Sequence, residues 1–235
     1  MEKTVKGNRI SADLLKWIAI VTMFIDHVGA AVVEKTNLLY QPNGEVVYFT
    51  LRYIGRLAFP IFCFLLIEGF YHTRNRGKYL RNLLLFALIS EIPFEISFLG
   101  ELVWGFRNVY FTLAIGMIVM MCLEKVKESA TEKQNLWALL IIASGAVLAE
   151  LLHTDYGAVG VLLIYILYKL RDDRKKQCIC GAIAMSYEIT APIAFLLMYK
   201  YNGVRRQKNL KYFFYAFYPL HLLFLYWIRT LIALY

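Results

Sequence analysis

Two ionisable residues, Asp26 and His27, stand side by side in an apolar segment that also contains Lys16. The segment, residues 14–33, is hydrophobic enough to enter a bilayer, where a charged side chain costs roughly 3 kcal/mol on insertion scales. Eleven helical residues make about three full turns, so Lys16 and His27 share one face, about 16 Å apart along the axis. A histidine can act as a general base, and a lysine can bind a phosphate. Together they suit a long ligand that lies along the helix.

Each of these residues also has a plain structural role that must be weighed against a chemical one. Lys16 would extend its ammonium group to the membrane surface while its methylene stem stays in the apolar layer. His27 would be a buried imidazole whose hydrogen bonds are satisfied. Asp26 lies about 100° around the helix from His27, so it cannot orient that ring by direct contact, and we expect it to pair with another helix.

Two arginines follow in the next apolar segment. Arg52 and Arg56 have i,i+4 spacing, which puts both on one helix face. Because this segment is expected to run back through the membrane, both lie at about the depth of Asp26 and His27. They either form ion pairs with Asp26 or Glu91, or line a site where their positive charge stabilises negative charge at a reacting centre.

Four further polar residues complete the candidate site. Glu91 and Glu95 are spaced i,i+4, and we expect them to line a polar cavity together with Asp155. Asp155 also precedes a predicted helix, for which it would be the N-cap. His221 follows a proline near the start of the last predicted helix. It is either an interfacial histidine among aromatic residues or, with Lys16 and Arg56, a residue that binds a cofactor.

These polar residues stand out because the chain is otherwise strongly apolar. Its 235 residues are 60% hydrophobic, and runs of about 18 or more apolar residues are typical of transmembrane helices. Ionisable residues inside a membrane are functional candidates because of their insertion cost, and this many of them predict a polar cavity. They are Lys16, Asp26, His27, Arg52, Arg56, Glu68, Glu91, Glu95, Glu150, Asp155, Glu188, His221 and Arg229.

The apolar runs predict an all-α, polytopic integral membrane helical bundle of about eight transmembrane segments, forming one domain over residues 1–235. The start of the chain lacks the small-residue cleavage site of a signal peptide, so we expect the first helix to be retained, with Ser11 as its N-cap. The predicted helices cover residues 11–33, 48–71, 78–99, 106–124, 135–151, 156–170, 177–201 and 212–234.

The net charge of +9 does not indicate nucleic-acid binding, because cytoplasmic loops of membrane proteins are themselves rich in Lys and Arg. Alternate predicted loops hold most of the basic residues, which places the N-terminus in the cytoplasm. The four cysteines lie in or beside apolar segments without zinc-ligand spacing, and no metal is implied. The basic residues are Lys3, Lys6 and Arg9; Arg74, Arg76, Lys78 and Arg81; Lys125, Lys127 and Lys133; and Lys169, Arg171, Arg174, Lys175 and Lys176.

One segment conflicts with this alternation. The loop after residues 177–201 is also basic, with Lys200, Arg205, Arg206, Lys208 and Lys211, although a single crossing would put it outside. Either the segment is re-entrant or broken around Glu188 and Pro192, which is tolerated where backbone is buried in protein, or the charge rule fails here. The first alternative is favoured.

Several motifs together resemble the TraX family. They are LLKWIAIVTMFIDHVG, RYIGRLAFPIFCFLLIEGF, EIPFE, DYGAVGVLLIYILY, YNG and KYFFYAFYPLHLL, in this order and over most of the chain. The spacing of Lys16 and His27 is also similar to the Arg/Lys-x10-His motif of the wider transmembrane acyltransferase group, which includes the acyltransferase-three family. The chain has fewer predicted helices than the acyltransferase-three core.

The resemblance implies a membrane acetyltransferase in a bacterial-type plasma membrane, since the founding TraX member is described as an acetylase of the pilin N-terminus. His27 would be catalytic, Lys16 would take the basic position of the motif, and the donor would be acetyl-CoA from the cytoplasm. Asp26, Arg52 and Arg56 would complete the catalytic group. The acceptor would be an amine or hydroxyl, such as a protein N-terminus or a cell-surface glycan. The alternative is a proton-coupled transporter, because buried His, Asp, Glu and Arg also build proton relays.

Overall fold

The structure is a computed structural model that describes residues 10–103, 105–129, 132–204 and 211–234. Its helices are α1 (Ala12–His27), α2 (Gly44–Gly55), α3 (Ala58–His72), α4 (Arg76–Phe98), α5 (Val109–Ser129), α6 (Gln134–Leu151), α7 (Gly157–Lys169), α8 (Arg174–Ala184), α9 (Ile193–Tyr199) and α10 (Lys211–Ala233). A π-helical turn, η1 (Val28–Val33), continues α1, and a 3-10 turn, η2 (Asn37–Tyr40), precedes α2. The predicted all-α bundle is confirmed.

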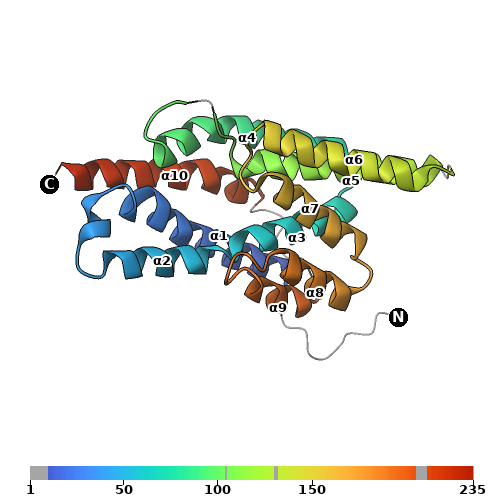
Figure 1. The fold of residues 1–235 in the computed structure, drawn as a ribbon, viewed down its shortest axis with the longest axis horizontal. Coiled ribbons are helices and arrows are strands. Elements are labelled where there is room, and N and C mark those ends of the chain that lie inside the picture. Colours follow the sequence, from blue (N-terminus) through green and yellow to red (C-terminus); the bar gives the residue numbers. More distant parts are fainter. Residues whose placement is uncertain (1–9, 104, 130–131, 205–210, 235) are drawn as a thin grey trace.

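The helices run along the long axis of the molecule in two layers. In Figure 1, α4, α5, α6 and α10 lie above α1, α2 and α3, with α7 between the two layers. Helix α1 packs against α2, α3 and α10, so the helix that carries Lys16 and His27 is at the centre of these contacts. Within the described ranges, five stretches are long and apolar enough to cross a membrane: Ala12–Val33, Gly44–His72, Val109–Ser129, Gln134–Leu151 and Tyr212–Ala233.

The start of α1 is formed as the sequence predicts. The Ser11 side chain accepts a hydrogen bond from the backbone N–H of Leu14 at 3.2 Å, and Asp13 lies in the first turn. Such a cap satisfies one of the donors that the first turn of a helix leaves without a partner. The helix is continuous from Ala12 to His27, so Lys16 and His27 do share one face.

The predicted helix over residues 48–71 is wrong in one respect, because it is two helices. A turn at Arg56 and Leu57 separates α2 from α3. Pro60 has no N–H to donate to the carbonyl of Arg56, four residues earlier, and proline is tolerated in the first turn of a helix. The proline therefore ends α2 and begins α3, and it places Arg56 at the break.

The last helix also differs from the prediction around its proline. Helix α10 continues through Pro219, so His221 lies within the helix and not near its start. The missing N–H of Pro219 leaves the carbonyl of Tyr215 without its helical donor. The hydroxyl of Tyr110 donates to this carbonyl at 3.2 Å, which ties α5 to α10.

The segment predicted over residues 177–201 is broken, as the favoured alternative required. Helices α8 and α9 are joined by a turn over residues 185–192 and pack against each other. The two ends of this hairpin lie together, because the Arg174 guanidinium is 5.4 Å from the centre of the Tyr201 ring. Beyond α9, the N–H of Asn202 donates to the carbonyl of Ile10 at 3.0 Å, next to the start of α1.

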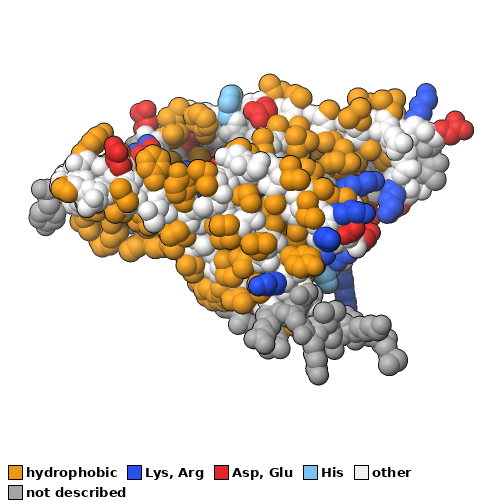
Figure 2. Space-filling view, turned by 60° about the horizontal axis from the view of Figure 1, so that its bottom comes forward, with side chains coloured by type: hydrophobic (Ala, Val, Ile, Leu, Met, Phe, Trp, Pro, Cys, Tyr) orange, Lys and Arg blue, Asp and Glu red, His pale blue; other side chains and the backbone are white. Residues whose placement is uncertain are grey.

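Because the hairpin returns to the end at which it begins, the basic segments gather at one end of the bundle, which we call the basic end. The loops after α3, α5 and α7 lie there, as does the chain beside Ile10 and Tyr201. Figure 2 shows Lys and Arg side chains clustered toward this end and a broad hydrophobic surface elsewhere. The basic residues at positions 3, 6, 9, 205, 206 and 208 lie outside the described residues. The positive-inside rule predicts that the basic end faces the cytoplasm.

Candidate functional site

Two cavities lie one after the other along α1. The basic-end cavity has a volume of about 400 Å³ and is lined in part by Ala12 and Lys16. The far cavity, about 340 Å³, lies toward the opposite end and is lined in part by Asp26 and His27. Phe62, on α3, lines both, so this residue lies between the two cavities. The shared face of α1 thus presents Lys16 to one cavity and His27 to the other.

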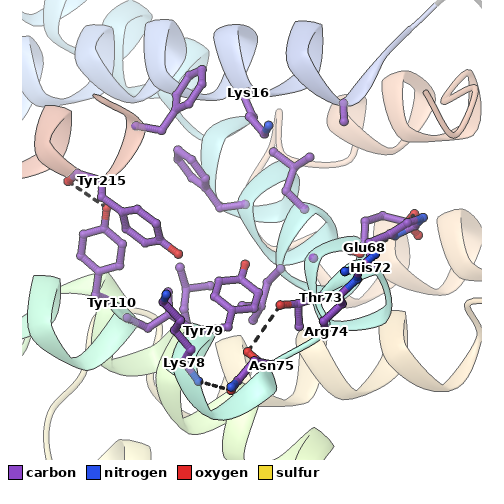
Figure 3. Close-up of a pocket in the computed structure, with 18 of the residues that line it drawn as sticks. Lys16, Glu68, His72, Thr73, Arg74, Asn75, Lys78, Tyr79, Tyr110 and Tyr215 are labelled. Atoms are coloured by element: carbon purple, nitrogen blue, oxygen red, sulfur yellow. Dashed lines mark hydrogen bonds and ion pairs between the residues drawn. The ribbon is translucent and has the colours of Figure 1, made fainter. Parts of the chain in front are cut away.

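Lys16 reaches into the basic-end cavity from α1. Figure 3 shows it pointing across the cavity toward the segment with Thr73, Arg74 and Asn75. Its ammonium group is 3.2 Å from a carboxylate oxygen of Asp13 and 5.5 Å from the centre of the Phe214 ring. The side chain is 19% exposed. Lys16 is therefore held within the cavity wall. A lysine that only extended its ammonium group to the membrane surface would not need these contacts.

The connection between α3 and α4 supplies further polar groups to this cavity. Arg74, Asn75 and Lys78 line it opposite Lys16. The side chain of Asn75 caps α4 by accepting the N–H of Lys78 at 2.7 Å. The N-terminus of α4 and these cations therefore make this wall electropositive, which suits an anionic ligand.

A buried carboxylate holds the base of this wall in place, and its partners could not be predicted from local sequence patterns. Glu68, on α3, is 6% exposed. Its Oε1 is 3.3 Å from Arg171 Nε and 3.5 Å from Arg174, at the start of α8. The Arg171 guanidinium also lies 4.2 Å from the centre of the Tyr71 ring. These contacts hold the loop after α7 against α3 and leave Arg74 and Lys78 facing the cavity.

Two ion pairs form one side of the far cavity. Arg52 Nη1 is 2.5 Å from Asp26 Oδ2, so Asp26 pairs with another helix as expected. Arg56 Nε is 3.2 Å from Glu188 Oε2, in the turn between α8 and α9. Glu188 could not be predicted as the partner of Arg56, because nothing in its local sequence shows that the hairpin tip reaches this depth. Both arginines line the cavity, each held in place by a carboxylate.

His27 lies beside the arginines in a pocket of aromatic rings. The ring of Phe98 approaches it edge-on at 5.1 Å between centres, and that of Tyr218 at 5.9 Å. His27 Nδ1 lies 2.6 Å from Nε2 of His221, on α10. His221 is 5% exposed and is not among the described residues that line either cavity. The structure thus places His221 behind His27, where a cofactor in either cavity would not touch it directly.

The acidic residues predicted to line a cavity divide into two groups. Asp155 lines the far cavity, but it is not the N-cap of α7 as predicted. Tyr156 takes that position, and Glu150 Oε1 accepts the N–H of Ala158 at 2.8 Å. The Glu150 carboxylate, at the end of α6, therefore caps α7 in place of Asp155. The chain turns into α7 through Tyr156, which has a left-handed backbone with φ of 65°.

Glu91 and Glu95 lie away from both cavities. Glu91 accepts hydrogen bonds from Arg107 at 2.8 Å and from Asn108 at 2.7 Å, so it fixes the connection between α4 and α5. Glu95 is fully buried, and its carboxylate oxygens have no hydrogen-bond partner among the described residues. Neither residue is among those that line the two cavities. The i,i+4 spacing does put both residues on one face of α4, but this helix packs against α5 and α10.

Comparisons with known proteins cover nearly the whole chain. The TraX protein family matches residues 11–229. The chain is 30% identical to the "Probable fimbrial assembly protein FimC, serogroup H1" of Dichelobacter nodosus, over 90% of this chain and 93% of that protein. It is 26% identical to "Protein TraX" of Escherichia coli, over 70% of this chain and 59% of that protein. No solved structure matches. The match begins at the cap of α1 and ends within α10, so it includes both cavities and the pair of histidines, and the chain belongs to the TraX family.

Proposed function

We propose that the protein is a membrane-bound acetyltransferase that moves an acetyl group from acetyl-CoA to an amine or hydroxyl acceptor. One observation carries the proposal. Lys16 and His27 lie on one face of α1, each lines a different cavity, and Phe62 lines both cavities. A long donor can therefore place an anionic end at Lys16 and a reactive end at His27, about 16 Å away along the helix axis.

The basic-end cavity suits the nucleotide part of acetyl-CoA. Lys16, Arg74 and Lys78 supply positive charge from two sides of the cavity, and phosphate groups bind to such cations and to helix N-termini. The thioester would pass Phe62 and meet the far cavity, with the donor arriving from the cytoplasm. The positive-inside rule supports this route, since the cavity opens at the basic end.

The far cavity suits the transfer step. His27 would take the proton from the acceptor amine or hydroxyl as that group attacks the thioester carbonyl carbon. The carbonyl oxygen gains negative charge, which Arg52 or Arg56 would stabilise. The carbon–sulfur bond then breaks, and His27 returns the proton to the leaving thiolate. A variant forms a transient acetyl-histidine, from which the acceptor takes the acetyl group.

A proton-coupled transporter remains the second candidate, because one observation favours it. Glu95 is a fully buried carboxyl whose oxygens have no partner among the described residues, and such groups carry protons in membrane pumps. It lies outside the two cavities, which is why transfer chemistry at His27 is preferred. A transporter would consume no acetyl-CoA.

Changing Lys16 tests the donor site. Lys16→Ala should weaken acetyl-CoA binding to the purified protein by roughly 5- to 30-fold, or about 1–2 kcal/mol for a charge-assisted contact. The same change should raise the KM for acetyl-CoA and leave kcat nearly unchanged, because a phosphate looks the same in ground and transition states. Titration with radiolabelled acetyl-CoA measures the first effect without any acceptor.

Two further variants make the Lys16 test specific. Lys16→Arg should bind acetyl-CoA almost normally, since Arg also binds phosphate and can keep the contact with Asp13. Lys127→Ala removes an equal charge from an exposed position near the end of α5 and should change nothing. Unchanged affinity in Lys16→Ala would mean that the shared face of α1 has no part in donor binding.

A further inference from the structure

The contacts of His221 fix the position of its proton. Its Nδ1 lies 2.7 Å from the carbonyl oxygen of Phe217, one helical turn earlier in α10. A carbonyl oxygen can only accept a hydrogen bond, so Nδ1 must carry the hydrogen. In the neutral ring the other nitrogen, Nε2, then has a free lone pair and acts only as an acceptor.

The two histidine rings lie side by side in almost the same plane. The angle between them is 8°, their centres are 4.9 Å apart, and His27 Nδ1 is 2.6 Å from His221 Nε2. Rings stacked face to face would be separated by about 3.5 Å or more, which a contact of 2.6 Å between nitrogens does not allow. The geometry is therefore that of an in-plane hydrogen bond, and His27 Nδ1 must be its donor.

We infer that His221 is a positioning residue that holds His27 in one tautomer, with the proton on Nδ1 and the basic lone pair on Nε2. This edge of the ring is opposite His221 and faces the far cavity, because His27 lines that cavity and His221 does not. The orientation of a histidine and its tautomer are commonly set by the bond that its other nitrogen makes. Here a second histidine, anchored by a backbone carbonyl, takes the place of the usual carboxylate.

The arrangement also explains how His27 would carry a proton during the transfer, a step that rests on the proposed function. A proton taken from the acceptor binds at Nε2 and makes the ring an imidazolium. The hydrogen bond from Nδ1 to His221 is then charge-assisted and stronger. His221 cannot pass the proton further, since its own Nδ1 already donates to Phe217. The proton on Nε2 of His27 is therefore the one that leaves with the thiolate.

Nitrogen-15 NMR of the purified protein with labelled histidine tests the tautomer directly. The chain has four histidines, and the signals of His27 are assigned by their loss in His27→Gln. In the wild type the proton should be on Nδ1 of His27. In His221→Phe, which keeps a ring but offers no acceptor, the proton should no longer be held there. This readout needs no acetyl transfer.

Kinetics and two comparison variants complete the test. His221→Phe should lower kcat by roughly 10- to 100-fold without changing acetyl-CoA affinity. His221→Gln should recover part of kcat and the Nδ1 proton, because its amide oxygen can accept the same bond. Phe224→Leu, which changes an exposed aromatic ring of α10 that contacts neither histidine, should behave as the wild type.

The outcomes separate the two proposals. A wild-type His27 protonated at Nε2, or an unchanged tautomer and turnover in His221→Phe, would overturn the role of His221. If the predicted tautomers are found but the protein transfers no acetyl group, the histidine pair stands and the proposed function fails.

Discussion

Replacing His27 with alanine should lower acetyl transfer by roughly 100-fold or more, because the variant has no base to take the acceptor proton. Acetyl-CoA should still bind with nearly normal affinity, since the cations of the basic-end cavity are untouched. The expected pattern is thus a loss of kcat with little change in donor binding, the reverse of that expected for Lys16→Ala. Release of free CoA, followed with a thiol reagent, measures turnover, and radiolabelled acetyl-CoA measures binding.

Two companion variants keep this result interpretable. His27→Gln keeps a hydrogen-bonding side chain of similar reach but no base, so it should be as inactive as His27→Ala. His153→Asn removes another histidine, from the connection before α7, at a left-handed position with φ of 48° that asparagine tolerates. It should retain wild-type turnover. Wild-type turnover in His27→Ala would rule out His27 as the base.

A single methyl group at Gly55 should disable the far cavity. This glycine, the last residue of α2, faces Asp26 so closely that an added Cβ would lie 2.1 Å from the Cβ of Asp26. Small residues allow such close approach between membrane helices. Gly55→Ala must therefore push α2 from α1 or displace Asp26 from Arg52. We expect a loss of stability of about 1–3 kcal/mol and of at least 10-fold in turnover, measured by thermal unfolding in detergent and by CoA release.

A second substitution at Asp26 and a control substitution at Gly77 make the Gly55→Ala experiment specific. The nearest atom is the Cβ of Asp26, so shortening Asp26 to alanine in the same chain should not restore stability. Gly77→Ala is the matched control, because its new Cβ would meet only the Asn75 side-chain oxygen, at 3.5 Å, and alanine favours a helix. It should be as stable as the wild type or more so. A stable, active Gly55→Ala would contradict the close contact between α1 and α2.

Features set by local sequence could be predicted without the structure. The cap at Ser11 needs one hydroxyl before an apolar run, and the shared face of Lys16 and His27 follows from helical geometry alone. The break within residues 177–201 could be predicted from charge. The loops on both sides of this segment are basic, and a single membrane crossing would have put one of them outside. These predictions succeeded because each depends on residues near one another in the chain.

Features set by partners far along the chain could not be predicted. His221 is 194 residues from His27, and no periodicity links them. Asp26 was one of the two partners predicted for the arginines, but its pairing with Arg52, and not Arg56, depends on how α2 meets α1. Glu188 was not predicted as the partner of Arg56, because that pair depends on where the hairpin tip lies. The failed cap at Asp155 has the same origin, because Glu150 reaches Ala158 only through the fold of the loop between them. The packing of the helices determines each of these pairings, and the sequence pattern does not show which side chains the packing brings together.

Sealed membrane vesicles from the native host, supplied with acetyl-CoA labelled in its acetyl group, test whether the protein transfers acetyl groups from the cytoplasmic side through His27. Inverted vesicles expose the cytoplasmic face, and right-side-out vesicles expose the other. Label should enter a membrane-bound acceptor only in inverted vesicles, and His27→Ala should abolish this labelling. Vesicles with Lys16→Ala should label the acceptor weakly at low acetyl-CoA concentration and approach the wild type when that concentration is raised. Labelling that is the same with wild type and His27→Ala, or no labelling in either orientation, would contradict transfer through His27.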